Sequence, residues 1–254
     1  MVYIGLSRYT DETIKKVINI KPTGVVLGDI LCLKRMFPYS GLEVTDYLND
    51  FKQHNIKVIF QTPMYATDRI FEKIIVELEY YNSKELVDGV IVQDVGVASK
   101  LREVCPNLDI IWGRMGYART PVINYSTLSF LISCGVSGYE FKNINNKNVA
   151  KKMGTTPYLV YGWPTYNTIN RECYYKFEND IFDDKCNCGC LKKDKMILGS
   201  DHDNAVTIDG CVLGFATEYL KENIEQYTDD TKFVIYGENI EKIQMLMQEV
   251  EVSL

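Results

Sequence analysis

The chain has 254 residues, enough for one (β/α) barrel or for two small domains. Its 34 acidic and 28 basic residues give a net charge of −6, which excludes the broad basic surface of a general nucleic-acid-binding protein. No window approaches the ~20 apolar residues of a membrane-spanning helix. Residues 1–10 lack the basic stretch and apolar run of a signal peptide, so we expect a cytoplasmic protein. In a reducing compartment, the eight cysteines favour metal or redox chemistry over disulfides.

Short apolar, β-branched stretches alternate with longer amphipathic ones along the chain. The predicted strands, in chain order, are 2–6, 24–27, 57–61, 89–93, 109–112, 136–141, 157–162 and 232–236. The predicted helices are 11–20, 43–54, 67–81, 97–104, 126–134, 146–152 and 241–250. Because the strands are apolar throughout rather than alternating, they are typical of a parallel sheet that is buried on both faces.

This order of elements in one chain of this length predicts an α/β fold, a (β/α)8 TIM-type barrel formed by residues 1–254 as a single domain. No glycine-rich phosphate-binding motif follows the early strands, as a Rossmann fold would require. The regular rhythm breaks at about 163–214, which we predict to be an irregular, cysteine-bearing insertion after the seventh strand. Such a long insertion at the carboxyl end of a barrel is typical of a functional segment.

Three cysteines within five residues, Cys186, Cys188 and Cys190, rarely arise from core packing. Cys173 precedes them in the same segment, and Cys32 follows the second predicted strand. Because parallel barrel strands all end on one face, we expect these cysteines to converge. Gathered thiolates bind an iron–sulfur cluster or a zinc ion. The cysteines lack the paired C-x2-C spacing of structural zinc sites, which favours a cluster and leaves zinc as the alternative.

Four segments carry a resemblance to a known family. They are GDILCLKRMF at 28–37, VDGVIVQDVGVASKLRE at 87–103, VINYSTLSFLISCGVSGYEF at 122–141 and YLVYGWPTYNTINRECY at 158–174. The specific feature is the spacing C-x12-C-x3-C of Cys173, Cys186 and Cys190, with Cys32 as the early cysteine. The chain resembles the collagenase-like peptidase U32 family, and within it the UbiU/UbiV-like [4Fe-4S] members. The resemblance runs over most of the chain and includes these four segments. The segments 112–116 and 162–164 depart from the family pattern, so the resemblance does not predict which substrate this chain uses.

The resemblance implies a [4Fe-4S] cluster bound by Cys32, Cys173, Cys186 and Cys190, with Cys188 as an alternate ligand. It also implies a part in oxygen-independent hydroxylation, or a related modification, of an aromatic or nucleobase substrate. The known members of this kind use an organic oxygen donor, such as prephenate, instead of dioxygen. On this basis we expect an Fe–S-dependent enzyme of the hydroxylase or transferase type, with a small molecule or an RNA base as substrate.

Two other functions are open. Proteins of this kind work in pairs, so the chain could instead be a non-catalytic electron-transfer or scaffold partner in a hetero-oligomer with a second U32-family protein. A peptidase has the least support, because the chain has only two histidines and neither an H-E-x-x-H motif nor a Ser/His/Asp or Cys/His pair in a suitable context.

Further candidates come from polar residues that end or follow apolar strands, where barrel side chains reach the mouth. The catalytic candidates among them are Glu140, Arg114, Asp94 and Tyr161. Asp29 and Gln61 occupy similar positions. Cys105 and Cys134, near the ends of predicted helices, are expected to be buried and inert.

Overall fold

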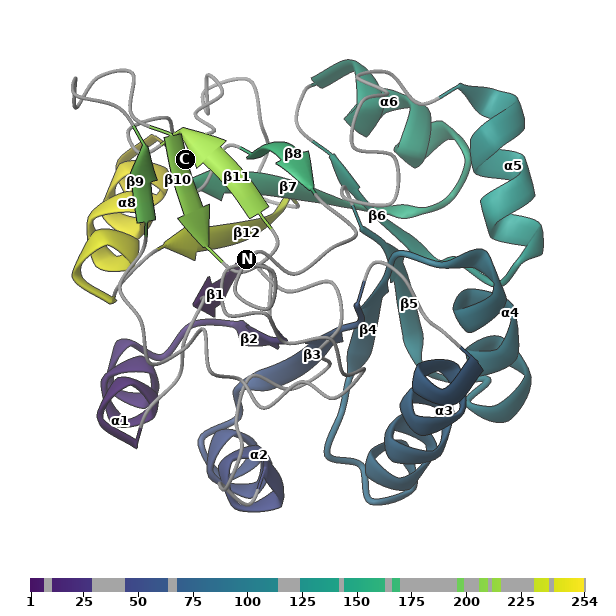
Figure 1. Cartoon of the computed structure of the whole chain (residues 1–254), viewed down its shortest axis with the longest axis horizontal. Coiled ribbons are helices and arrows are strands. Elements are labelled where there is room, and N and C mark those ends of the chain that lie inside the picture. The colour runs from purple at the N-terminus through teal and green to yellow at the C-terminus, as the bar shows by residue number, and fades with distance from the viewer. Residues whose placement is uncertain are drawn as a thin grey trace.

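The computed structural model describes residues 1–6, 11–28, 44–63, 68–113, 124–141, 144–162, 166–169, 196–198, 206–209, 212–215, 231–237 and 240–253. Eight parallel strands close into a barrel in the order β1-β12-β7-β6-β5-β4-β3-β2 (Figure 1). These strands are β1 Val2–Leu6, β2 Gly24–Leu27, β3 Lys57–Gln61, β4 Gly89–Val92, β5 Asp109–Trp112, β6 Gly138–Phe141, β7 Thr156–Gly162 and β12 Lys232–Gly237. The helices are α1 Asp11–Ile20, α2 Val44–Gln53, α3 Asp68–Ser83, α4 Val95–Val104, α5 Tyr125–Ser133, α6 Ile144–Lys152 and α8 Ile240–Ser253. The predicted (β/α)8 TIM-type barrel is therefore confirmed.

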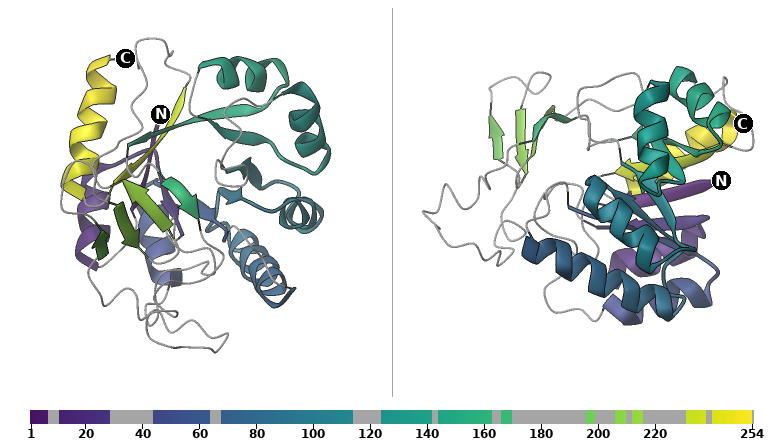
Figure 2. Two further views of the ribbon diagram at one scale, coloured as in Figure 1. Left: turned by 45° about the horizontal axis from the view of Figure 1, so that its top comes forward. Right: turned by 90° about the vertical axis from the view of Figure 1, so that its right-hand side faces the viewer.

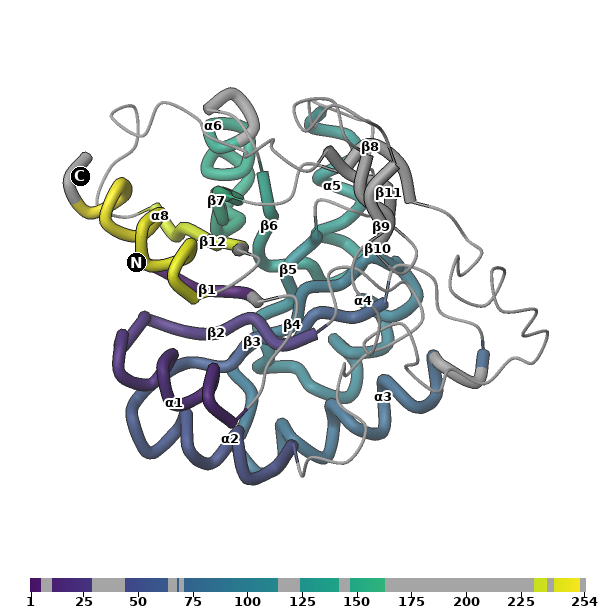
Figure 3. The backbone as a smooth tube through the Cα atoms, turned by 60° about the vertical axis from the view of Figure 1, so that its left-hand side comes forward, coloured from purple at the N-terminus to yellow at the C-terminus, as the bar shows by residue number. Residues whose placement is uncertain are grey.

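The barrel strands are apolar on both faces because each face packs against a different layer. Alternate residues, such as Ile59, Ile91 and Val234, form one cluster made only of strand side chains, which fills the interior of the barrel. Their neighbours, such as Phe60 and Ile235, pack with helix residues in a second and larger cluster. The tube view in Figure 3 shows the helices outside the ring of strands. None of the described helices is long and apolar enough to cross a membrane.

The segment 163–214 differs from the prediction, because part of it forms regular structure. Its strands are β8 Tyr166–Ile169, β9 Met196–Leu198, β10 Val206–Asp209 and β11 Val212–Phe215. They pair antiparallel in the order β8-β11-β10-β9. Pairing of Asp209 with Val212 leaves residues 210 and 211 as a two-residue connection, the length of a tight hairpin, and the glycine at its first position suits such a turn. We therefore correct the expectation of a wholly irregular insertion.

The small sheet belongs to the carboxyl end of the barrel. The chain leaves the barrel at Gly162, the last residue of β7, and enters the small sheet at Tyr166. In the right-hand view of Figure 2 the N-terminus, where β1 begins, lies at the right and the small sheet lies at the left. The small sheet therefore stands beyond the end at which the barrel strands finish, which is where barrel enzymes place their active sites.

Candidate functional site

A tyrosine from β12 crosses the interior of the barrel at its carboxyl end. The Tyr236 hydroxyl lies 3.2 Å from Gln61 Oε1 and 3.1 Å from Glu140 Oε1. These partners come from β3 and β6, and all three side chains are buried. A phenol carries one proton, so the hydroxyl can donate to only one of the two oxygens at a time. The three residues therefore form a buried network in which a proton can be held beside a carboxylate.

A glycine on the neighbouring strand makes room for this tyrosine. β1 pairs with β12 so that Gly5 lies beside Tyr236. A Cβ atom added at Gly5 would lie 2.6 Å from Tyr236 Cε1, closer than two carbon atoms can approach. The aromatic ring therefore rests directly on the backbone of β1, which directs its hydroxyl across the barrel.

Gln93 is a second buried polar residue at the carboxyl end. It follows β4, and the residue is 6% exposed. Neither Nε2 nor Oε1 of its carboxamide has a hydrogen-bond partner in the described part of the chain. A buried polar group without a partner costs roughly 1–3 kcal/mol, so such a group calls for an explanation.

The opposite, amino end of the barrel is closed by a separate polar cluster. Lys232 Nζ donates to the Tyr158 hydroxyl at 3.1 Å and lies 4.8 Å from the centre of that ring. The rings of Tyr3 and Tyr158 pack edge to face at 5.8 Å. Burial, with smaller contributions from Asp109 and Asp88, raises the pKa of Tyr3 to about 12. The Tyr3 hydroxyl therefore stays protonated at neutral pH, and this end is filled by packed side chains.

The structure brings together two of the residues predicted at the mouth and separates two others. Gln61 and Glu140 meet through Tyr236. Asp94 instead caps α4, because its carboxylate accepts from the backbone N–H groups of Gly96 at 2.8 Å and Val97 at 3.1 Å.

Tyr161 also departs from its predicted position. It belongs to the cluster between the strands and the helices, and its hydroxyl donates to Glu249 Oε2 on α8 at 2.9 Å. Burial first, and then this hydrogen bond, raise the pKa of the Tyr161 phenol above its usual value. Its placement at the barrel mouth is therefore corrected: Tyr161 anchors the last helix.

The other predicted site residues lie outside the described residues. These are Asp29, Arg114 and the cysteines Cys32, Cys173, Cys186, Cys188 and Cys190. Among the described residues, no group of three or more His, Cys, Asp and Glu side chains could hold a metal ion. Cys105 is fully buried in the core as expected, whereas Cys134 is half-buried at the end of α5.

Sequence reasoning missed Gln93 and Tyr236. A signal for Gln93 was present, because the strands KVIFQ at 57–61 and GVIVQ at 89–93 both end in glutamine. Both glutamines face inward, because Gln61 pairs with the inward-facing Ile91 and Gln93 comes two residues after Ile91. No comparable signal marks Tyr236, which resembles Tyr161 in being an aromatic residue near the end of an apolar strand.

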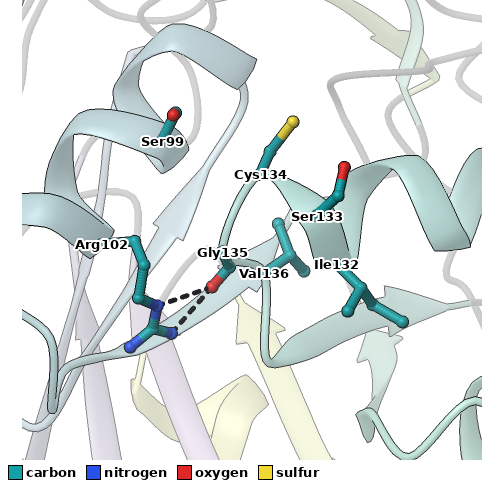
Figure 4. Close-up of a pocket in the computed structure, with 7 residues that line it drawn as sticks. All are labelled: Ser99, Arg102, Ile132, Ser133, Cys134, Gly135 and Val136. Carbon is teal, nitrogen blue, oxygen red and sulfur yellow. Dashed lines mark hydrogen bonds between the residues drawn. The ribbon is translucent and has the colours of Figure 1, made fainter.

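A surface hollow lies away from the mouth, where α4 and α5 end (Figure 4). It has a volume of about 410 Å³ and is lined by residues that include Arg102 and Cys134. Arg102 Nε and Nη2 donate to the carbonyl oxygen of Gly135 at 3.0 and 2.7 Å. The guanidinium group therefore joins the two helices, and we assign this hollow a structural role.

Comparisons with known proteins support the fold. The structure is similar to that of the U32 peptidase Mk0906, with a TM-score of 0.55 and 14% identity over 94% of this chain and 93% of that chain. The likeness is one of fold. A chitinase from Chromobacterium violaceum has a TM-score of 0.47 at 9% identity, with 99% of this chain and 98% of that chain covered. No protein-family model and no curated protein matches the sequence. A U32 peptidase structure thus has a similar fold, as the resemblance implied.

We expect the Tyr236→Phe variant to be about 1–3 kcal/mol less stable than the wild type, because it removes the hydroxyl that bridges two buried oxygens. Urea denaturation measures this loss. The matched control is Tyr161→Phe. The Tyr161 hydroxyl, which this change removes, bonds to a half-buried glutamate that water can still reach. We expect the control to lose clearly less stability, and equal losses would contradict a special role for the network.

Proposed function

We propose that this chain is an iron–sulfur enzyme that holds a [4Fe-4S] cluster on Cys32, Cys173, Cys186 and Cys190 at the carboxyl end of the barrel. We propose that it hydroxylates, or otherwise modifies, an aromatic or nucleobase substrate with an organic oxygen donor in place of dioxygen. The reaction class comes from the resemblance of the sequence to cluster-binding U32 proteins. The fold, similar to that of a U32 peptidase structure, is compatible with it.

The observation that carries the proposal is the topology of β2 and β7. Both strands belong to one parallel barrel and so end on the same face. Cys32 follows β2 along the chain, and Cys173, Cys186 and Cys190 follow β7. The two cysteine-bearing segments therefore leave the barrel at the end that holds the Tyr236 network. Four thiolates are the donor set that a [4Fe-4S] cluster requires.

The residues of the mouth fit the chemistry that such a site needs. A bound cluster supplies electron transfer. The side chains contribute proton handling, because Glu140 and Tyr236 place a carboxylate and a phenol 3.1 Å apart. Gln61 holds the Tyr236 hydroxyl from the other side at 3.2 Å and limits its rotation. Burial of the network keeps bulk water away from the protons that it exchanges.

The proposal is tested by anaerobic purification of the whole chain, with an absorption spectrum and iron and zinc analysis. A broad visible absorption band with about four irons per chain supports it. A colourless protein with one zinc ion would show that the cysteines form a zinc site instead. A protein without metal would overturn both assignments.

A further inference from the structure

We infer that Gln93 recognises the ligand of the barrel mouth, and that this ligand presents a cis-amide edge, the N–H and C=O side by side as in a lactam ring. The inference rests on the proposed function only in taking the carboxyl end of the barrel as the substrate site. It adds the chemistry by which a substrate is chosen there.

The position of Gln93 directs its side chain into the barrel. Ile91, two residues earlier, belongs to the interior cluster. Because successive residues of a strand point to opposite faces, Gln93 shares the inward direction of Ile91. The neighbouring strand β5 pairs Ile111 with Ile91 and Trp112 with Val92, so Gly113 comes level with Gln93.

The carboxamide of Gln93 lies directly against this glycine. A Cβ atom added at Gly113 would lie 2.1 Å from Gln93 Nε2 and 2.8 Å from Oε1. The whole amide plane therefore lies against the backbone of Gly113, in space that any other residue would fill. Ile91 and Ile111 close the interior on the amino-terminal side. The ligand of this inference therefore approaches the carboxamide from the carboxyl end of the barrel.

The chemistry of the side chain selects the ligand. A carboxamide offers a donor, Nε2–H, beside an acceptor, Oε1. A cis-amide has the complementary acceptor and donor on one edge and forms both hydrogen bonds in one plane. An ionised carboxylate lacks the donor and an ammonium group lacks the acceptor. Peptide bonds are trans and place N–H and C=O on opposite sides, so the peptide backbone does not match this edge.

Gln61 provides an internal comparison. It ends β3 and pairs with Ile91, so it also faces inward but lies two residues nearer the amino end than Gln93, and its Oε1 accepts from the Tyr236 hydroxyl. Gln93 has no such partner among the described residues, although it is 94% buried. The rival explanation is a bridging water that satisfies Gln93 and gives it a structural role. The two explanations predict opposite effects on stability.

The first test is the urea unfolding midpoint of the Gln93→Met variant in the absence of ligand. Methionine has a similar length and no group that needs a hydrogen bond. If the carboxamide is reserved for a ligand, its removal relieves an unpaired group, and the midpoint rises with an unchanged slope. A lower midpoint would show that Gln93 is satisfied within the folded chain and would overturn the inference. The control is Gln53→Met, the same change at an exposed position of α2, with no increase expected.

The second test measures binding of δ-valerolactam, N-methyl-δ-valerolactam and N-methylacetamide by ligand-observed NMR titration. The wild type is expected to bind the first at least ~tenfold more tightly than the other two, since each of them loses one hydrogen bond or the planar match. Gln93→Met is expected to lose this preference. Gly113→Ala retains the glutamine but displaces it, and is expected to lose the preference as well. Equal binding of the three probes by the wild type would overturn the inference.

The outcomes separate this inference from the proposed function. If the chain lacks iron but still distinguishes the lactams, the Gln93 inference stands and the cluster proposal fails. If the chain holds about four irons but does not distinguish the lactams, the cluster proposal stands and the Gln93 inference fails. Gln93→Met is expected to keep the iron content of the wild type, because it changes no thiolate.

Discussion

The Cys186→Ala variant is expected to lose the visible absorption band and most of its iron. A [4Fe-4S] cluster is held by one thiolate on each iron, and removal of one of four protein ligands exposes an iron to exchange and loss. Cys186 belongs to both spacings that carry the resemblance. Twelve residues lie between Cys173 and Cys186, and three lie between Cys186 and Cys190. The measurement is the iron content and spectrum of the variant after anaerobic purification beside the wild type.

Two alanine variants serve as controls for this result. Cys188→Ala changes the cysteine that the family spacing leaves out, only two positions away, and is expected to retain its iron. Cys134→Ala changes a half-buried thiol at the end of α5, away from the mouth. Iron loss in Cys188→Ala with retention in Cys186→Ala would move the ligand assignment to Cys188. Equal retention in all three variants would mean that neither Cys186 nor Cys188 by itself is required to hold the cluster.

The barrel could be predicted because its signal is repeated eight times. Each strand is a short apolar stretch, and each predicted strand bound lies within two residues of the observed one. Stretches such as GVVL at 24–27 are buried along their whole length, as expected of a parallel strand with a layer on each side. Because the same pattern recurs, an error at one strand does not change the fold class.

That same pattern hides which side chains enter the interior. When both faces of a strand are apolar, the sequence has no alternation to separate the inside from the outside. Tyr161 and Tyr236 both lie near the ends of apolar strands, yet the first contacts α8 and the second crosses the barrel. Glu140 was easier to find, since a carboxylate inside the apolar stretch GYEF calls for a partner. Asp94 and Gln93 are neighbours in the sequence, yet Asp94 caps a helix whereas Gln93 points into the barrel.

The small sheet was missed for a different reason. Its strands have three or four residues, too few for a reliable alternation. Strand partners far apart in the chain, such as Thr168 and Leu213, cannot be paired by a local pattern. The glycine at 210 is a local turn signal, and it predicts one hairpin without the other two strands.

The Gly162→Ala variant is expected to lose about 3–5 kcal/mol of stability. Gly162 has a φ of +98°, which strains any residue with a Cβ atom. That atom would also lie 2.4 Å from the backbone oxygen of Tyr236 and 2.8 Å from Leu246 Cδ1. Each effect costs roughly 1–3 kcal/mol, and a backbone oxygen held in a barrel strand cannot move away cheaply. Urea denaturation of the variant and the wild type measures the sum.

Gly154→Ala separates the two causes, since Gly154 has a φ of +75° and nothing within 4 Å of the added atom. It is expected to lose about 1–2 kcal/mol from backbone strain alone. A similar loss in both variants would mean that β7 and β12 separate easily at the mouth. The larger loss at Gly162 would mean that the backbone of Tyr236 is held rigidly against β7. The Tyr236 hydroxyl then stays between Gln61 and Glu140 because the strand that carries it has no room to shift.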